Sequence, residues 1–366
     1  MKASIPLDGL KTALAAVCRA TAVASTRTEL CCALMVAGED SVEFSATDGT
    51  HSTRVMVPAL VERVGRALVP AQRLSDVART LPDGAVSIDA TEKRAEIDCV
   101  AASLVLPALD PFGFPSFPRV DPDASVTLPF APLKAALQRA MRFVKKPGKD
   151  GKSDAMCGVL IEWSDGELRV VSTDGVRVSI ERIPIGGSSA GSVVSPARLI
   201  ADVIALDTPG TVTIGASENQ VSVAMSSVSL VARRLAGTYP NWRLFDELKS
   251  YVARAVFDRN ELLAAARRTL ALGQGGQQPK LAIVDGCVSA VVSRCAGEDG
   301  ESCEDVACSG ATGTADATLN GVYLAAALAA VPTDEVVIEI GEGRNPVMFM
   351  TRGGEYKCAT MPIWMG

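Results

Sequence analysis

The sequence is poor in the residues that most enzymes use. It has one histidine, His51, among 366 residues, and only 4% of its residues are aromatic. A single histidine leaves little for the common Cys/His zinc sites or for Ser-His-Asp catalysis. We find no glycine loop of P-loop spacing and no cluster of metal ligands. We therefore expect a protein that is not an enzyme and needs no cofactor or metal.

The ten cysteines are scattered, and none forms a Cys-x-x-Cys pair. Reduced thiols that act as small apolar side chains are the expected state, although a thiol enzyme activated by a carboxylate is an open alternative. No apolar run is long enough to span a membrane, and the first residues lack the apolar region of a signal peptide. We expect a cytoplasmic protein without a membrane partner.

Positive charge is in the minority, with 36 Lys and Arg residues against 42 Asp and Glu residues. A net charge of −6 argues against a chain that binds nucleic acid with its whole surface. It leaves room for a local basic face.

A long internal repeat fills the chain. Extended apolar segments lead into amphipathic helices at residues 5–10, 126–133 and 256–263, and again at 68–74, 193–199 and 318–324. A turn and a strand follow each second helix, at residues 82–88, 209–214 and 332–338. A period of roughly 120 residues is too long for a solenoid repeat and fits tandem domains. We predict three similar domains, at residues 1–120, 121–248 and 249–366.

Two Asp-Gly pairs predict β-hairpins. Alternating segments at residues 41–47 and 167–173 run into Asp48-Gly49 and Asp174-Gly175, and a second alternating segment follows each pair. Glycine accepts the positive φ that such turns require. The third copy has a longer loop, at residues 291–300, instead. Helices alternating with antiparallel strands predict an α+β fold with helices on one side of the sheets, and a structural or surface role for His51.

The helix expected from residue 133 onward has one apolar and one basic side. The apolar positions are Leu133, Ala136, Leu137, Ala140, Met141 and Val144, and the basic ones are Lys134, Arg139, Arg142, Lys145 and Lys146, followed by Lys149 and Lys152. A solvated face is the common explanation of such a run, but its density in an acidic protein favours a polyanion partner. Few aromatic residues are available to stack on bases, so we expect phosphate contacts to duplex DNA without base recognition.

Several motifs together carry a resemblance to a known family. They are Ala46-Thr-Asp-Gly49, Ser172-Thr-Asp-Gly-Val-Arg177, Gly237-Thr-Tyr-Pro-Asn-Trp242, the acidic stretch at residues 298–304, Asn320-Gly-Val-Tyr323 and Met361-Pro-Ile363. In this order and spacing they resemble the bacterial sliding clamp, the β subunit of the replicative DNA polymerase. The resemblance covers the whole chain.

This resemblance implies three tandem DNA-clamp domains and a head-to-tail homodimer that closes into a ring. Helices would line the hole, and double-stranded DNA would be bound without regard to sequence. The residues expected to face DNA are Arg27, Arg73, Lys134, Arg139, Arg142, Lys145, Lys146, Lys149, Arg198 and Arg268.

The resemblance also implies one apolar pocket per chain for peptides of the polymerase, the clamp loader and other replication and repair proteins. Its expected wall is Met156, Thr173, Gly175, Val176, Arg177, Pro240, Leu244, Phe245, Asn320, Tyr323, Met348, Met361, Pro362 and Ile363. Core packing is an equal alternative for each apolar member taken singly. Val176 and Leu244 stand where the family commonly has polar or basic residues, and three residues follow Ile363. A clamp for a divergent polymerase, or one encoded by a phage or plasmid, is therefore an alternative.

For the ring joint, the resemblance implies that Leu104 and Leu106 meet Leu270 and Leu272 of a second copy. Arg73 is expected either to face Glu301 and Glu304 across this joint or to contact DNA, and the sequence leaves both open. The remaining alternative is a repeat-built adaptor that binds proteins and never encircles DNA.

Overall fold

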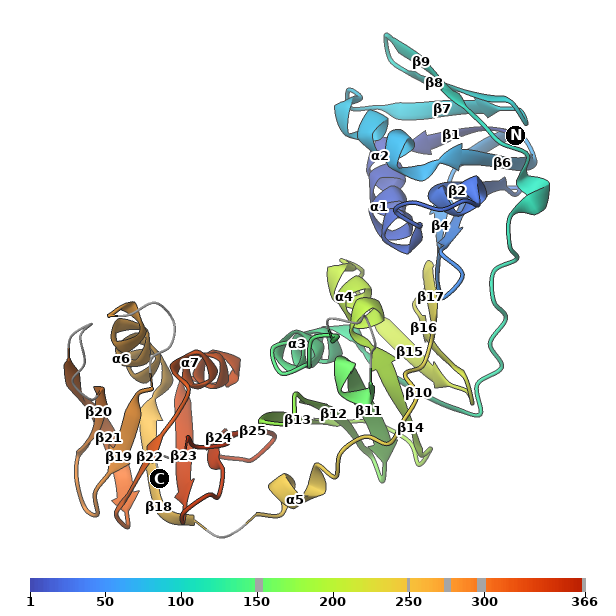
Figure 1. Ribbon diagram of the computed structural model, residues 1–366. Helices are drawn as coiled ribbons and strands as arrows, with labels where there is room; N and C mark the ends of the chain where they lie inside the picture. The colour runs from blue at the N-terminus through green and yellow to red at the C-terminus, as the bar shows by residue number, and fades with distance from the viewer. Residues whose placement is uncertain (149–153, 249–250, 273–277, 295–300, 364–366) are drawn as a thin grey trace. The chain divides into compact units, whose positions relative to one another are not determined.

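A computed structural model describes residues 1–148, 154–248, 251–272, 278–294 and 301–363 (Figure 1). The chain divides into two compact units, one of residues 1–134 and 189–234 and the other of residues 135–188 and 235–366. The predicted second domain contributes residues to both units. The division into three domains stays a prediction.

The first unit contains two antiparallel sheets. One has the order β5-β1-β7-β8-β9, and the other β10-β15-β16-β17-β4-β3-β2-β6. The strands of the first are β5 (Leu60–Arg63), β1 (Lys2–Pro6), β7 (Ala85–Ala90), β8 (Arg94–Cys99) and β9 (Ala102–Pro107). Those of the second are β10 (Ala124–Pro129), β15 (Thr211–Ala216), β16 (Gln220–Ala224), β17 (Val228–Arg233), β4 (His51–Pro58), β3 (Ser41–Thr47), β2 (Cys32–Ala37) and β6 (Gly65–Pro70).

Three helices belong to this unit: α1 (Leu7–Val17), α2 (Ala71–Thr80) and α4 (Ala197–Ala205), which follows β14 (Gly191–Pro196). Helix α1 packs against β3 and β4 and against α2. Its buried residues include Leu10, Leu14 and Val17, one side of an amphipathic helix.

The second unit contains a long antiparallel ladder. Its order runs β11-β12-β13-β25-β24-β23-β18-β21-β20-β19-β22. The bounds are β11 (Gly158–Ser164), β12 (Glu167–Thr173), β13 (Arg177–Pro184), β25 (Tyr356–Thr360), β24 (Val347–Met350), β23 (Glu335–Gly341), β18 (Tyr251–Asp258), β21 (Ser302–Thr312), β20 (Ser289–Arg294), β19 (Lys280–Ile283) and β22 (Ala315–Thr318).

Helices α6 (Arg259–Ala271) and α7 (Gly321–Ala330) of this unit pack against each other and against its strands. They share one core with the strands, in which Leu262, Leu324 and Phe349 are fully buried. The short α5 is Arg243–Asp246, and α3 (Phe130–Ala140) crosses the boundary between the units. The α+β fold with antiparallel sheets is confirmed.

All six predicted passages from strand to helix are present. In the first two copies proline precedes the helix, as Pro6, Pro70 and Pro196 do, in an extended conformation. The third copy uses polar caps instead. Asp258 accepts a hydrogen bond from the amide of residue 261, and Asn320 accepts two from the amides that begin α7. Both devices set where the helix begins.

The basic helix is shorter than predicted. Helix α3 ends at Ala140, and the chain tightens there into a turn in which the amides of Arg142 and Phe143 donate to the carbonyls of Arg139 and Ala140. The Ser172 hydroxyl donates to the carbonyl of Ala140, at 2.7 Å, and the Arg177 guanidinium to that of Arg142, at 3.1 Å. Buried Phe143 fixes the turn. The predicted helical stripe up to residue 144 is therefore wrong, and the basic residues at 142, 145 and 146 lie in the segment after the helix.

Both Asp-Gly hairpins are confirmed. In β3–β4 and β12–β13 the turn glycines have φ of +93° and +91°. Each turn aspartate accepts two backbone hydrogen bonds, from residues 50 and 51 to Asp48 and from residues 176 and 177 to Asp174. Strand β4 pairs with β17, and β13 pairs with β25. We call β3, β4 and β17 the first hairpin frame and β12, β13 and β25 the second hairpin frame.

Candidate nucleic-acid interface and peptide pocket

The basic residues of the first unit differ in their exposure and in their hydrogen-bond partners. Arg73 is exposed, and Arg27 is exposed beside Glu29, at 2.9 Å. Lys134 is half-buried, and its ammonium donates to the carbonyl of Leu206 at 2.6 Å. An ammonium held in this way has less freedom to follow a phosphate than an exposed one.

In the second unit, Arg142 and Lys146 are exposed. Lys145 lies 2.5 Å from Asp154, and this hydrogen-bonded pair raises the pKa of the lysine and lowers the pKa of the aspartate. Exposed pairs of this kind contribute little energy and exchange readily for other partners. Lys149, also expected to face DNA, lies outside the described residues.

Two further residues that were predicted to contact DNA form ion pairs within the second unit. Arg139 forms a bidentate pair with Glu181, with distances of 2.8 and 2.5 Å, and both side chains are mostly buried. Arg268 pairs with Glu304 at 2.6 Å on the surface, which raises the pKa of the arginine. The Arg139 pair is structural in character, because a buried carboxylate needs its cation.

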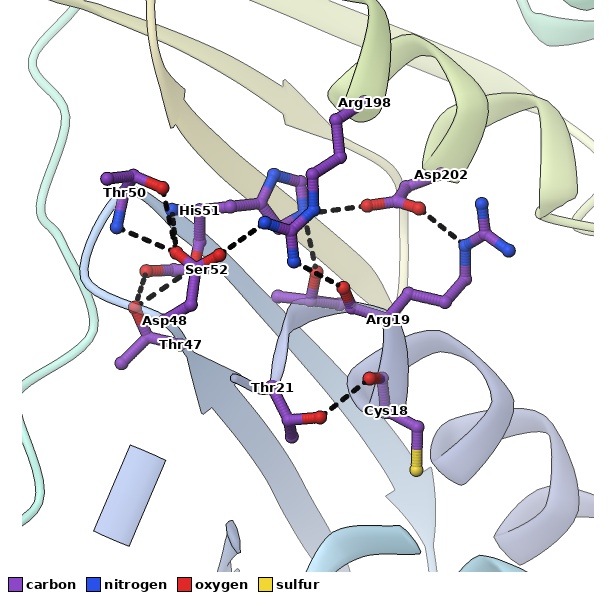
Figure 2. A network of polar contacts seen from close by, with 11 residues as sticks. Cys18, Arg19, Thr21, Thr47, Asp48, Thr50, His51, Ser52, Arg198 and Asp202 are labelled. Atoms are coloured by element: carbon purple, nitrogen blue, oxygen red, sulfur yellow. Dashed lines mark hydrogen bonds and ion pairs between the residues drawn. The ribbon is translucent and has the colours of Figure 1, made fainter. Parts of the chain in front are cut away.

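The first hairpin frame carries a polar network, drawn in Figure 2. His51 is buried, and its Nε2 lies 2.9 Å from Asp202 on α4. Arg19 binds the other oxygen of Asp202, and Arg198 binds Asp48 and the carbonyl of Arg19. The structural role predicted for the single histidine fits this placement. Arg198, although half-exposed, is part of this network.

The second hairpin frame is organised by Arg177. Its Nε donates to Asp174 at 2.9 Å. The guanidinium lies 4.1 Å from the ring centre of Tyr323 and 5.2 Å from that of Phe143. Cation–π contacts of this kind stabilise by about 0.5–2 kcal/mol each, more when they are desolvated. Arg177 thereby ties the hairpin to the start of α7.

The chain end completes this site. The amide of Met361 donates to the carbonyl of Val176 at 3.1 Å, and that of Ile363 donates to Thr318 at 2.7 Å. A side chain on Gly175 would meet the sulfur of Met156 at 3.9 Å. Predicted pocket residues from four separate segments therefore lie around one turn.

Segment 237–246 joins the site through polar contacts. The Tyr239 hydroxyl donates to the carbonyl of Val171. Asp246 of α5 binds Arg182 on β13 and Lys357 on β25. Burial raises the pKa of Asp246, but these two cations outweigh burial and hold that pKa below its usual value. Pro240 and Leu244 of this segment are exposed, and Phe245 is half-buried.

Not every predicted wall residue is available to a ligand. Met348 is buried in β24, the Asn320 side chain caps α7, and the Thr173 hydroxyl is used inside the turn. Sequence reasoning missed Phe143 and Asp246, which hold the site in place. No sequence signal marks Asp246, because its partners are distant in the chain.

The residues predicted for the ring joint lie on strand β9 and near the end of α6, and their role in a joint stays a prediction. Strand β9 is an edge strand, with Leu104 and Leu106 half-buried on it. Leu270 is half-buried near the end of α6, and Leu272 just after it is exposed. Glu301 is exposed, whereas Glu304 already has Arg268 as its partner. Both roles for Arg73 stay predictions.

In the part of the chain that the structure describes, no helix is both long and apolar enough to cross a membrane. Among the same residues, no group of three or more His, Cys, Asp or Glu side chains is placed to hold a metal ion.

Comparisons with known proteins agree with one another. Family models of the DNA polymerase III beta subunit match residues 1–118, as its N-terminal domain, and residues 134–241, as its central domain. A beta sliding clamp of Synechocystis sp. is 25% identical and covers 97% of this chain and 96% of its own length. One of Streptomyces coelicolor is 22% identical, with 99% of each covered.

Solved structures show the same fold. A DNA polymerase sliding clamp from Bacillus subtilis superposes with a TM-score of 0.91 at 21% identity, covering 100% of both chains. A sliding clamp from Pseudomonas aeruginosa, solved with griselimycin bound, gives 0.92 at 19% identity, also over 100% of both. With the two family models matching more than half of its residues, the chain belongs to the family of the bacterial DNA polymerase III beta subunit, the beta sliding clamp.

Proposed function

We propose that this DNA sliding clamp works as a head-to-tail homodimer that closes around duplex DNA and tethers the replicative polymerase. The observation that carries the proposal is the family match along the chain, and it is supported by β9, an edge strand with Leu104 and Leu106 half-buried on it. Edge strands with apolar residues pair readily with another chain, so a joint at β9 would remove that hazard. In this scheme the chain is a non-catalytic subunit that acts in the cytoplasm.

The exposed cations supply the contact with DNA. Arg27, Arg73, Arg142 and Lys146 are exposed, and they lie on or near helices or in the segment after α3. Phosphate contacts hold a duplex without sequence information, and each is individually weak. A closed ring does not need tight contacts, because it retains DNA by topology. Weak contacts then allow sliding.

The second hairpin frame with α5, the start of α7 and the chain end forms the pocket for partner peptides. Apolar grooves bind short peptides through a few apolar anchors. The polymerase, the clamp loader and other replication and repair proteins would compete for this one site on each chain.

Retention on DNA tests this function. The chain is loaded, by the clamp loader of the same cell with ATP, onto nicked circular DNA, and half of the sample is then linearised. A clamp stays on the circle and runs off the free ends, and its solution mass corresponds to two chains. Equal loss from circle and line, or a mass of one chain at working concentration, would refute the ring and favour an adaptor.

A further inference from the structure

The first unit contains a cavity lined by α1, the end of α4 and the paired strands β4 and β17. Its volume is about 310 Å³, within the range of pockets that hold small organic ligands. Apolar side chains form much of its wall, among them Val55, Leu206, Val228 and Leu230. None of the roles proposed above for DNA, partner peptides or the ring joint involves this cavity.

In the second hairpin frame, three large side chains meet beside α3. Arg139 makes its two hydrogen bonds to Glu181, and Glu181 pairs with Tyr356 where β13 runs along β25. Tyr356 is fully buried. A guanidinium, a carboxylate and an aromatic ring therefore fill the space between α3 and these two strands.

The first hairpin frame has small apolar residues at the same three positions. Helices α1 and α3 are both 11 residues long and both follow a strand that ends in proline, which aligns Ala16 with Arg139. Val55 and Glu181 are each the fifth residue of their strand, and the strand partner of Val55 is Val228. Ala16, Val55 and Val228 all line the cavity. The first unit thus lacks the ring and the guanidinium that fill the second.

The charged groups that line the cavity are two aspartates and one arginine, namely Asp202, Asp207 and Arg19. Asp202 is 5% exposed, and its Oδ1 accepts from Arg19, whose side chain is 43% exposed (Figure 2). Its Oδ2 lies 2.9 Å from Nε2 of His51, but no donor among the described residues is in hydrogen-bond geometry with it. A buried acceptor without a donor is costly, so an N–H group that reached this oxygen would be stabilised.

We infer that this cavity binds a small cation with a flat apolar body, such as an aryl amidinium or an aryl guanidinium. The body would pack against Val55 and Val228, where the second hairpin frame has its own ring, and the cationic N–H groups would donate to Asp202. An anion of the same shape would meet two carboxylates and an arginine that is already paired. Every residue that lines the cavity belongs to the first unit, so such a ligand would bind without using the peptide pocket.

The test uses the full-length chain and three probes of one shape: benzamidine, which is cationic, benzamide, which is neutral, and benzoate, which is anionic. Isothermal titration calorimetry measures the affinity and the stoichiometry of each. We expect benzamidine to bind once per chain with a Kd below about 1 mM, a modest affinity for a ligand of its size. Benzamide should bind at least about tenfold more weakly, because it cannot make a charge-assisted hydrogen bond to Asp202. Benzoate should not bind.

Variants that fill the cavity locate the site. Ala16→Leu fills it from the helix and Val228→Phe from the strand, and each should abolish benzamidine binding while circular dichroism and urea unfolding show a folded chain. Ala24→Leu is the matched control, because Ala24 is exposed and does not line the cavity, and it should bind as the unmodified chain does. Asp202→Asn should bring the affinities for benzamidine and benzamide to within a few-fold of each other, since only the cation loses its partner.

Three outcomes would overturn the inference. Benzamidine that does not bind saturably below about 10 mM would show that the cavity takes no such ligand. Benzamide or benzoate that binds the unmodified chain as tightly as benzamidine would contradict the preference for a cation. Unchanged benzamidine binding to a folded Ala16→Leu or Val228→Phe variant would place the ligand elsewhere. Retention on circular DNA and the solution mass do not depend on this cavity, so the ring is tested separately.

Discussion

Replacing Arg139 by methionine should destabilise the second unit rather than simply weaken DNA binding. The guanidinium makes two hydrogen bonds to Glu181, and the two side chains are 21% and 12% exposed. Burial lowers the pKa of Arg139, but the hydrogen bonds and charge of Glu181 outweigh burial and raise it overall. Removing one member of a buried pair typically costs about 3–5 kcal/mol. Because the guanidinium is partly open to water, we expect a loss of about 2–4 kcal/mol.

Urea unfolding of the single variants and of the double variant Arg139→Met/Glu181→Met measures this. The double variant should lie within about 1 kcal/mol of the unmodified chain, because no unpaired charge is left. It should also keep the salt dependence of DNA binding. A single variant that unfolds like the unmodified chain, yet lowers the slope of log affinity against log salt by about 0.9, would show that Arg139 contacts a phosphate. That result would refute the structural role.

Three further predictions follow from the exposed cations, the edge strand and the anchor of α5. Reversing the charge of Arg142 and Lys146 together should lower the salt slope of binding to a short duplex by up to about 1.8 and shorten retention on circular DNA, with dimer mass unchanged. Leu106→Asp should shift the solution mass to one chain, whereas Val105→Asp, facing the other side of β9, should have a smaller effect; equal effects would argue against the proposed joint. Because the folded pKa of Asp246 is depressed, its stabilisation of α5 is complete above the ordinary pKa of about 3.9 and is lost as pH falls below it. Hydrogen exchange of α5 should follow this acid transition, and Asp246→Asn should abolish the transition.

Most helices, strands and hairpins could be predicted because each is marked by residues that are close together in the sequence. Strand-to-helix passages are marked by period and by proline or polar caps, and the hairpins by Asp-Gly. The end of α3 was predicted wrongly for the opposite reason. Its apolar spacing continues past residue 140, but the backbone tightens there into a turn, and the Ala140 carbonyl that accepts from the amide of Phe143 also accepts from the Ser172 hydroxyl, on a strand distant in sequence. Periodicity carries no information about such a partner.

For the candidate site too, some features could be predicted from the sequence and others could not. Resemblance indicated which residues belong to the pocket, but not that Arg177 is held between Asp174 and two rings, or that Met348 is buried. The sequence likewise does not show that Lys146 is exposed whereas Arg139 is mostly buried in an ion pair with Glu181.

The sequence by itself determined the repeat, the class of fold, the family and the positions of its cations, because each of these is written in residue order and spacing. Only the tertiary structure decided which cations are available to a ligand. That choice depends on carboxylates, carbonyls and rings brought close by folding, and an ion pair between residues 42 positions apart has no trace in local sequence.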